Sequence, residues 1–481
     1  MIQGYNPRTG APAGAPVQET TDDQVDALVT AAAAAYPAWS GRTPLDRAVA
    51  LAAMADALDA RTAELAAVAD TETALGTERL TGEVGRASGQ LRLFAGVLRD
   101  GSYLDPVASA AAGAAPGIWR VNRPLGPVAV FAASNFPFAF SVPGGDTASA
   151  LAAGCPVVVK AHEAHPRTAE LTASILASAL ASAGAPDGTF ALVHGVQAGL
   201  RLLRHHAITA AGFTGSTAGG LALARVCAGR DVPIPFFGEL GSVNPGVVLP
   251  GAASARASQV AAGYAASLTQ GAGQFCTNPG LLFVPEDPAL LSAIAAAVAG
   301  SAGAPMLSAR IFTAFQEAVA ATAAHPGVTE LASGQPGEGP WGATPRVFAT
   351  SLKEFAADTG ALAREQFGPA AVIVTYPSVA DLLPVLAALP GNLAASLHID
   401  GAADLALAGE LVAVLERIAG RIIVDGWPTG VAVVAAQHHG GPFPATTAPA
   451  YTSVGTAAIR RWLVPVAYQN FPAGLLPAAC R

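Results

Sequence analysis

The sequence predicts an α/β protein with two parallel β-sheets. Short apolar segments such as residues 128–131 and 157–160 alternate with helical stretches, as expected for buried parallel strands joined by crossover helices. The chain has 481 residues, which exceeds the usual size of a single core, so two or three domains are expected. A composition of 52% hydrophobic and 12% charged residues indicates large packed cores and argues against disorder.

Charge and composition narrow the range of partners. A formal net charge of −8 argues against nucleic acid and against a polybasic contact with membranes. Mean hydropathy is positive, but no run approaches ~20 strongly apolar residues, so no membrane span is expected. The N-terminus lacks a basic region followed by an apolar core, which predicts no signal peptide. The four cysteines form no CxxC pair; this predicts no disulfide framework and no metal site, and it favours a reducing cytoplasm.

The N-terminal region predicts packing helices. Residues 22–70 show helical spacing of apolar side chains, and residues 72–98 are expected to form a third long helix. Residues 107–117 are rich in glycine and alanine. Residues 118–123 then alternate in the manner of a two-sided strand in a hairpin.

From residue 127 strands and helices alternate, and the carboxyl ends of such strands are where ligands bind. The first set has predicted strands at 128–131, 156–160, 190–193 and 208–213, with helices at 146–153, 167–183, 198–203 and 218–228. The second set has strands at 246–249, 281–284 and 371–375, with helices at 254–267 and 288–299. Residues 326–345 are rich in glycine and proline and predict a loop. The tail mixes β-formers with basic residues at 459–466 and is expected to dock onto another element.

Cys276 lies in a run of glycine, glutamine and asparagine at residues 270–280. Glycines permit a close approach of the backbone to a ligand and conformations closed to other residues. A cysteine in such a setting can act as a nucleophile if its thiolate is stabilised. The other interpretation is a small buried hydrophobic side chain.

Two further side chains suit a reaction at this cysteine. Asn135 follows a strand end close to a proline, where its amide could donate to an oxyanion; asparagines in turns more commonly serve the backbone. Glu239 lies in an apolar, glycine-flanked segment. Burial there is expected to raise its pKa and make it a general base near neutral pH. Alternatively, it is a buried carboxylate bound to backbone N–H groups.

Three segments suit a nucleotide. Residues 213–220 end a strand and open a helix. The free N–H groups at the start of this helix favour a bound pyrophosphate. The other interpretation is an ordinary strand-to-helix turn capped by a side chain. Lys160 closes an apolar strand near Glu163, and such a pair can meet ribose hydroxyls, although a lysine there can simply extend to solvent. Residues 365–369 could present a carboxylate and a ring to a ligand. The histidine pairs at 205–206 and 438–439 predict no metal site on spacing alone.

In this order, the segments resemble the aldehyde dehydrogenase superfamily from about residue 123 to the C-terminus. Residues 239–241 and the Cys276 stretch carry most of the resemblance, supported by residues 134–137, 213–217 and 365–369. Further segments are similar to the 2,5-dioxovalerate (α-ketoglutarate semialdehyde) dehydrogenases and their relatives acting on long-chain aldehydes. These segments are residues 144–148, 439–446, 452–455 and 468–472.

The resemblance implies oxidation of an aldehyde to a carboxylic acid with NAD or NADP. Cys276 would attack the aldehyde to give a thiohemiacetal, while the Asn135 side chain and the Cys276 N–H hold the oxyanion. Hydride transfer to the nicotinamide would leave a thioester, and Glu239 would activate the water that releases the acid. His439 would lie near the cysteine and tune it.

The resemblance also assigns the cofactor contacts. The adenosine ribose would meet Lys160 and Glu163, the pyrophosphate Gly215 and Ser216, and the nicotinamide ribose Glu365 and Phe367. A carboxylate at position 163 welcomes a free 2′-hydroxyl and repels a 2′-phosphate, so it favours NAD, with NADP left open. The family's usual Glu-Leu-Gly-Gly-Lys reads Glu-Leu-Gly-Ser-Val at residues 239–243, a position where the narrower group also varies.

The implied architecture is aldehyde dehydrogenase-like, with two parallel-sheet α/β domains and a small oligomerisation element. Residues 1–238 would form the cofactor-binding domain, with an oligomerisation hairpin at about 110–125. Residues 239–435 would form the catalytic domain, and residues 436–481 the return segment and oligomerisation tail. A cytoplasmic homodimer or homotetramer is expected.

The expected substrate is α-ketoglutarate semialdehyde, whose distal carboxylate needs cationic or hydroxyl partners such as Arg123 or Thr452 and Ser453. A long-chain or other aliphatic aldehyde stays open. A cysteine hydrolase or acyl transferase using Cys276 and Glu239 without a redox cofactor is the alternative from another class. A cofactor-binding scaffold without activity is the third hypothesis.

Overall fold

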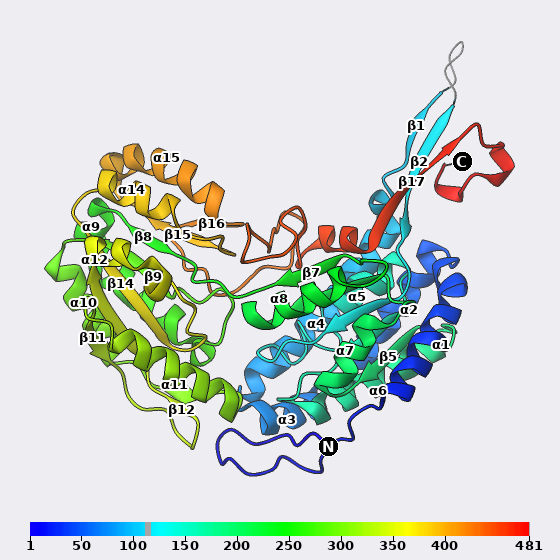
Figure 1. Ribbon diagram of the computed structural model, residues 1–481, viewed down its shortest axis with the longest axis horizontal. Coiled ribbons are helices and arrows are strands. Elements are labelled where there is room, and N and C mark those ends of the chain that lie inside the picture. The colour runs from blue at the N-terminus through cyan, green and yellow to red at the C-terminus, as the bar shows by residue number, and fades with distance from the viewer. Residues whose placement is uncertain (111–116, 481) are drawn as a thin grey trace.

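The computed structural model describes residues 1–110 and 117–480 and contains two α/β units, each built on its own sheet (Figure 1). The first sheet has the strand order β5-β4-β3-β6-β7 and is parallel throughout. Its strands are β3 (Val128–Phe131), β4 (Val157–Lys160), β5 (Phe190–Val193), β6 (Ala210–Thr214) and β7 (Phe236–Glu239). The first four match the predicted segments closely.

Helices cover both faces of this sheet because its short strands are apolar on both sides. In β3, Val128 and Val130 pack into one core, and Ala129 and Phe131 pack into the core on the opposite face. The helices of the unit are α1 (Asp22–Ser40), α2 (Pro44–Asp59), α3 (Thr62–Thr73), α4 (Thr77–Asp100), α5 (Gly145–Ala153), α6 (Pro166–Ser182), α7 (Val196–Arg204) and α8 (Thr217–Ala228).

The helix expected at residues 72–98 begins later than predicted. Ala74 has a φ of 54° and Gly76 a φ of 87°, so the chain leaves the helical conformation between α3 and α4. The left-handed conformation ends α3 and lets α4 start in a new direction. Leu80, Val84 and Leu91, which recur at helical spacing in α4, are all buried.

The second unit is built on a sheet with the order β11-β13-β14-β9-β8-β15-β16, parallel except for its edge strand β11. The strands are β8 (Gly246–Val248), β9 (Leu281–Pro285), β11 (Thr329–Ser333), β13 (Arg346–Ser351), β14 (Ala370–Tyr376), β15 (Ala395–His398) and β16 (Ile422–Val424). The helices are α9 (Pro250–Thr269), α10 (Pro288–Ala299), α11 (Ala309–Ala323), α12 (Leu352–Ala357), α13 (Thr359–Leu362), α14 (Val379–Ala387) and α15 (Gly401–Ile418).

The prediction of a loop at residues 326–345 is wrong in part. This stretch contains β11 and also β12 (Gly342–Ala343), which pairs with β10 (Ala304–Pro305). β11 is a partly exposed edge strand, so it lacks the apolar run that marked the buried strands.

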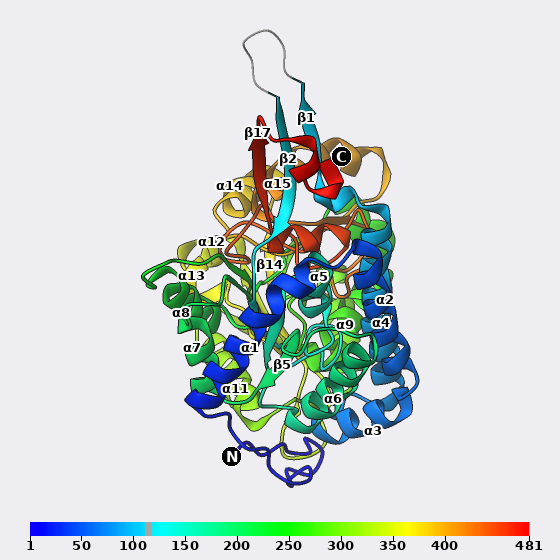
Figure 2. The ribbon, with the colours of Figure 1, turned by 90° about the vertical axis from the view of Figure 1, so that its right-hand side faces the viewer.

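A three-stranded antiparallel sheet projects from the first unit (Figure 2). It consists of β1 (Val107–Ser109), β2 (Ile118–Pro124) and β17 (Leu463–Gln469), with β2 in the middle. The predicted hairpin strand at 118–123 is therefore correct, and the tail docks on it as expected. Residues 111–116 of the expected oligomerisation hairpin lie outside the described residues.

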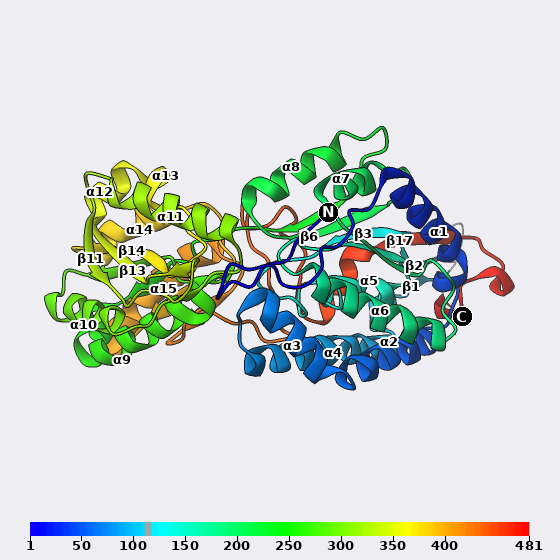
Figure 3. The same ribbon diagram turned by 90° about the horizontal axis from the view of Figure 1, so that it is seen from below.

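The two units are also joined at their lower side. The N-terminal segment leaves the first unit and reaches the second, as Figure 3 shows from below. There the Tyr5 ring lies edge-on to the Trp341 ring, with 6.3 Å between centroids. Among the described residues, no helix has the length and apolar character needed to cross a membrane.

Candidate active site

Cys276 lies in a tight loop between α9 and β9. The preceding turn, η2 (Gln270–Gly273), has a positive φ at Gly271, Ala272 and Gly273. A Cβ at Gly273 would lie 2.2 Å from the backbone carbon of Gly368. The glycine is therefore required by a neighbouring backbone segment and by its left-handed conformation. The loop is half-buried at Cys276, whose carbonyl accepts a hydrogen bond of 2.8 Å from Asn244 Nδ2.

Cys276, His439 and Glu239 come together at one point. Cys276 Sγ lies 3.7 Å from His439 Nε2, which lies 2.8 Å from Glu239 Oε1. The three potential ligand atoms are within 4.8 Å of one another, a spacing that would also suit a metal ion, although the sequence predicts no metal site. The cluster combines a nucleophile, an imidazole and a carboxylate, as nucleophilic catalysis requires.

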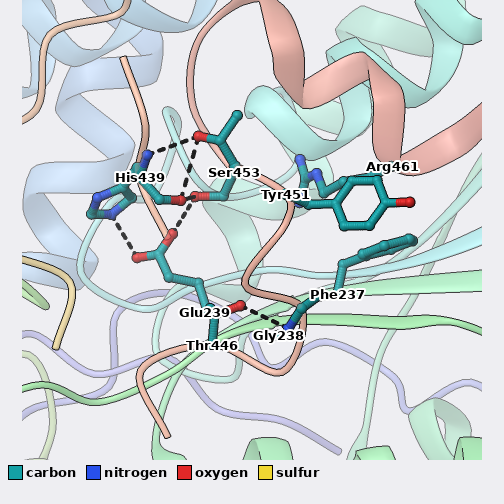
Figure 4. A pocket seen from close by; sticks show the side chains of 10 residues that line it. Phe237, Gly238, Glu239, His439, Thr446, Tyr451, Ser453 and Arg461 are labelled. Atoms are coloured by element: carbon teal, nitrogen blue, oxygen red, sulfur yellow. Dashed lines mark hydrogen bonds and ion pairs between the residues drawn. The ribbon is translucent and has the colours of Figure 1, made fainter. Parts of the chain in front are cut away.

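The carboxylate is held from both sides. Figure 4 shows His439 on one oxygen of Glu239 and Ser453 on the other. Ser453 Oγ donates a hydrogen bond to Glu239 Oε2. The backbone N–H of His439 donates a hydrogen bond of 2.8 Å to Thr452 Oγ1. Glu239, His439 and Ser453 also line a cavity of about 10 Å³, close to the smallest volume that holds a water molecule.

The expected rise in the pKa of Glu239 is wrong. Burial acts to raise the pKa, but the charge and hydrogen bond of His439, with hydrogen bonds from Ser453 and Cys276, hold it below its ordinary value. The sequence argument considered burial alone, whereas the partners stabilise the ionised form. Glu239 is therefore a carboxylate at neutral pH.

Cys276 shows the opposite shift. Burial and then the negative charge of Glu239 raise its pKa well above the ordinary value. The thiol is thus protonated in this arrangement, and a thiolate needs either a higher pH or a partner that removes the proton. His439 Nε2 contacts both Cys276 Sγ and the ionised Glu239, so it carries the proton of the latter hydrogen bond and faces the sulfur as a donor.

Asn135 lies next to the cysteine loop. Its side-chain Nδ2 donates a hydrogen bond of 2.9 Å to the backbone carbonyl of Gln274. The backbone carbonyl of Asn135 accepts a hydrogen bond of 2.8 Å from Arg79. The side chain is buried with 6% exposure. An amide nitrogen carries two N–H groups, so one can fix the side chain while the other serves an oxyanion. Asn135 thus fits both interpretations offered by the sequence.

Four of the six predicted cofactor residues lie at the carboxyl ends of the first sheet. Lys160 ends β4 and forms an ion pair with Glu163. Gly215 and Ser216 are exposed at the start of α8, where Ser216 Oγ accepts 3.3 Å from the Gly219 N–H. Ser216 is therefore the helix cap, and the other N–H groups of the first turn point outward.

Glu365 comes from the second unit and reaches the first. A Cβ at Gly241 would lie 2.1 Å from Glu365 Oε2, so this carboxylate packs directly on the chain that follows β7. Burial raises the pKa of Glu365 to about 7, against a hydrogen bond from the Ser242 backbone that lowers it. Phe367 is half-buried, with a φ of 45°.

These positions fit a dinucleotide. The strand order places β4 and β5 on one side of β3, and β6 and β7 on the other. Such a reversal creates a crevice at the carboxyl ends, where nucleotides bind. The exposed start of α8 can receive a pyrophosphate, and Lys160 with Glu163 offers a donor and an acceptor for ribose hydroxyls.

Asn244 was not identified from the sequence. Its Nδ2 binds the carbonyls of Cys276 and Asn278, and its Oδ1 accepts from the Ala394 N–H. It therefore ties the cysteine loop to the second sheet. Asn244 has a φ of 48°, a conformation that asparagine tolerates better than most residues, and its position before Pro245 was the available signal.

Of the three candidates for a distal carboxylate partner, Arg123 lies away from the cluster, and Thr452 and Ser453 lie at the cluster with their hydroxyl groups engaged. Arg123 is exposed on the projecting sheet, in β2. Ser453 is committed to Glu239, and Thr452 to the backbone of His439 and Val454. His205 and His206 stack on each other at 4.7 Å. Of the two predicted histidine pairs, only His439 joins the cluster.

The raised pKa of Cys276 yields a test. Glu239→Gln removes the negative charge that raises this pKa, so the thiolate fraction at pH 8 increases. Iodoacetamide should alkylate Cys276 about 3–10-fold faster, the effect of lowering the pKa by roughly half to one unit. The rate is measured on the Cys276 peptide by mass spectrometry, without cofactor. Glu163→Gln should leave it unchanged; slower alkylation in Glu239→Gln would contradict the assigned electrostatics.

Comparisons with known proteins agree with this geometry. The model of the aldehyde dehydrogenase family matches residues 1–440. The chain is 44% identical to alpha-ketoglutaric semialdehyde dehydrogenase 2 of Azospirillum brasilense, over 99% of this chain and 92% of the relative. It is 41% identical to alpha-ketoglutaric semialdehyde dehydrogenase of Acinetobacter baylyi, with the same coverage.

The fold is similar to that of solved structures. The structure of PnpE in complex with nicotinamide adenine dinucleotide has a TM-score of 0.83 at 22% identity, covering 100% of this chain and 96% of that one. The predicted fold class and the predicted resemblance are confirmed. The chain belongs to the aldehyde dehydrogenase family.

Proposed function

We propose that this chain oxidises α-ketoglutarate semialdehyde to 2-oxoglutarate with NAD. The identity of 44% and 41% to two enzymes named for this substrate, over nearly the whole chain, carries the proposal. In the reaction the aldehyde, water and the oxidised cofactor give the carboxylate, the reduced cofactor and two protons. The chain must therefore supply a nucleophile, an oxyanion site and a base for water.

Cys276 is the proposed nucleophile, and His439 the group that prepares it. His439 Nε2 lies 3.7 Å from Cys276 Sγ and 2.8 Å from Glu239 Oε1, so the same nitrogen faces both groups. The ionised Glu239 can only accept, so Nε2 carries the proton of that hydrogen bond and would stabilise the Cys276 thiolate as a donor. The thiol proton would leave to solvent, as one of the two protons that the overall reaction releases. Sulfur then bonds to the aldehyde carbon, and the carbonyl oxygen gains negative charge. The Asn135 amide and the Cys276 N–H would stabilise this oxygen.

When bound, the nicotinamide cofactor accepts a hydride from the carbon attached to Cys276. Lys160, Glu163, Gly215, Ser216, Glu365 and Phe367 are the residues proposed to hold the cofactor. The acyl group left on the sulfur is a thioester, and Glu239 is the proposed base for its hydrolysis. Its carboxylate is ionised and can accept a proton from water, while the lowered pKa makes it a weaker base than an ordinary glutamate.

The proposed architecture follows the family resemblance. Residues 1–238 would be the cofactor-binding domain, residues 239–435 the catalytic domain, and residues 436–481 the return segment and tail. Exposed apolar side chains on the projecting sheet, including Val107, Val464 and Val466, support its use as an oligomer contact. We propose a cytoplasmic homodimer or homotetramer.

A substrate panel tests the proposed function. α-Ketoglutarate semialdehyde should have a kcat/KM at least about tenfold above succinic semialdehyde and pentanal, equivalent to about 1.4 kcal/mol of transition-state selectivity. The measurement is initial-rate formation of reduced cofactor at 340 nm. A higher kcat/KM for pentanal would favour the aliphatic aldehyde alternative and reject the proposed substrate.

Glu163 should control the choice of cofactor. The Lys160–Glu163 ion pair sets a carboxylate at the proposed ribose contact, where it would repel a 2′-phosphate. Glu163→Thr should raise the ratio of kcat/KM for NADP to that for NAD by roughly tenfold or more, since an anionic repulsion of about 1–2 kcal/mol is removed. Glu170→Thr, an exposed acid on α6, is the control. An unchanged ratio in Glu163→Thr would reject the proposed NAD preference.

A further inference from the structure

Arg86 is a half-buried cation on α4 without a polar partner. Its Nε and Nη2 are shielded from solvent and make no hydrogen bond, and no ion pair of the described residues includes it. A guanidinium carries five N–H donors. Leaving such donors buried without an acceptor is costly, which indicates that an acceptor is provided by another molecule.

Other arginines near the cysteine loop differ in this respect. Arg79, about two helical turns before Arg86, donates to the backbone carbonyl of Asn135. Arg421 donates to the backbone carbonyls of Pro428 and Gly430. Both side chains thus serve the protein's own backbone. Arg86 alone of these three has its fork unengaged.

The acid nearest to Arg86 on the helix does not satisfy it. Glu83 is 5% exposed, and its Oε1 accepts from the Phe138 and Ala139 N–H groups at 2.8 and 3.1 Å. This carboxylate therefore fixes the chain after Asn135. Burial lowers the pKa of Arg86, and the charge of Glu83 opposes this shift. Glu83 provides no hydrogen bond to the guanidinium.

The guanidinium lies among aromatic rings beside the cluster. Arg86 Cζ is 5.6 Å from the Phe136 ring and 5.2 Å from the Phe140 ring. The Phe140 ring is 6.4 Å from the His439 ring, and the Phe136 ring is 5.2 Å from that of Phe275, the neighbour of Cys276. The charges of Cys276 and Glu239 also contribute to the pKa of Arg86. The cation is thus close to the reacting sulfur.

We propose that Arg86 binds the distal carboxylate of the substrate, while Phe136 and Phe140 contact the carbon chain between that carboxylate and the aldehyde. This inference rests on the proposed function, because it assumes an aldehyde with an anionic end. A carboxylate matches the guanidinium fork in two parallel hydrogen bonds. It also supplies the acceptors that the buried donors lack.

The test compares two substrates of equal carbon number in wild type and Arg86→Met. For α-ketoglutarate semialdehyde, kcat/KM should fall about 10–100-fold, as expected for a lost hydrogen-bonded charge pair. For pentanal, which has no carboxylate, it should change less than about threefold, the effect of a few tenths of a kcal/mol. Arg86→Lys should recover part of the selectivity because it keeps the charge without the fork.

Arg99→Met is the matched control, since Arg99 is exposed on the same helix. Product inhibition by 2-oxoglutarate provides a second readout that needs only pentanal turnover, and it should weaken in Arg86→Met by a similar factor. Equal losses for both substrates, or unchanged inhibition, would overturn the inference. A wild-type enzyme that prefers pentanal would count against the proposed function. The inference about Arg86 is tested separately, by how much Arg86→Met changes the ratio of kcat/KM for α-ketoglutarate semialdehyde to that for pentanal. If Arg86→Met does not fold, an unchanged ratio in Arg86→Lys would also overturn the inference.

Discussion

The geometry of the cluster depends on the contact between β7 and the return segment, residues 436–455. Glu239 ends β7 and forms a bridge with Thr446, while the Leu240 N–H donates 2.8 Å to the Ala445 carbonyl. This pairing positions His439 and Ser453 on the two oxygens of Glu239. Cys276 arrives from a third segment, tied by Asn244 to the second unit. Cys276, His439 and Glu239 are therefore brought together only when both units and the return segment are folded together.

The electrostatics of the cluster keep the Cys276 thiol protonated at rest. Glu239 keeps its charge because His439 and Ser453 bind its oxygens, and that charge in turn raises the pKa of Cys276. The resting thiol is protonated, which limits its reaction with oxidants and alkylating agents. In the proposed mechanism, loss of the thiol proton would give a thiolate that the Nε2–H of His439 can stabilise. The charge of Glu239 would thus keep the resting thiol protonated, while its oxygen orients the His439 donor.

Much of the fold could be predicted because its strands are short and apolar and its helices regular. Residues 128–131, 190–193 and 288–299 were predicted with the bounds of β3, β5 and α10. The edge strand β11 was missed since partial exposure removes the apolar signal, and the start of α4 was misplaced since Ala74 adopts a left-handed conformation. Contacts between residues far apart in the sequence could not be predicted from local sequence patterns. The contact between Cys276 and His439, for example, joins residues 163 positions apart. The pKa of Glu239 was predicted in the wrong direction for the same reason, because its partners come from the return segment.

In the proposed mechanism Cys276 carries the acyl group and Glu239 releases it. The most direct measurement is peptide mass spectrometry of the Glu239→Gln variant, quenched in acid after mixing with α-ketoglutarate semialdehyde and NAD. We expect a thioester on the peptide containing Cys276, increased in mass by the acyl group of the substrate. The Cys276→Ala variant should carry no adduct. Rapid turnover by Glu239→Gln without such an adduct, or an acyl group on another residue, would rule out this mechanism.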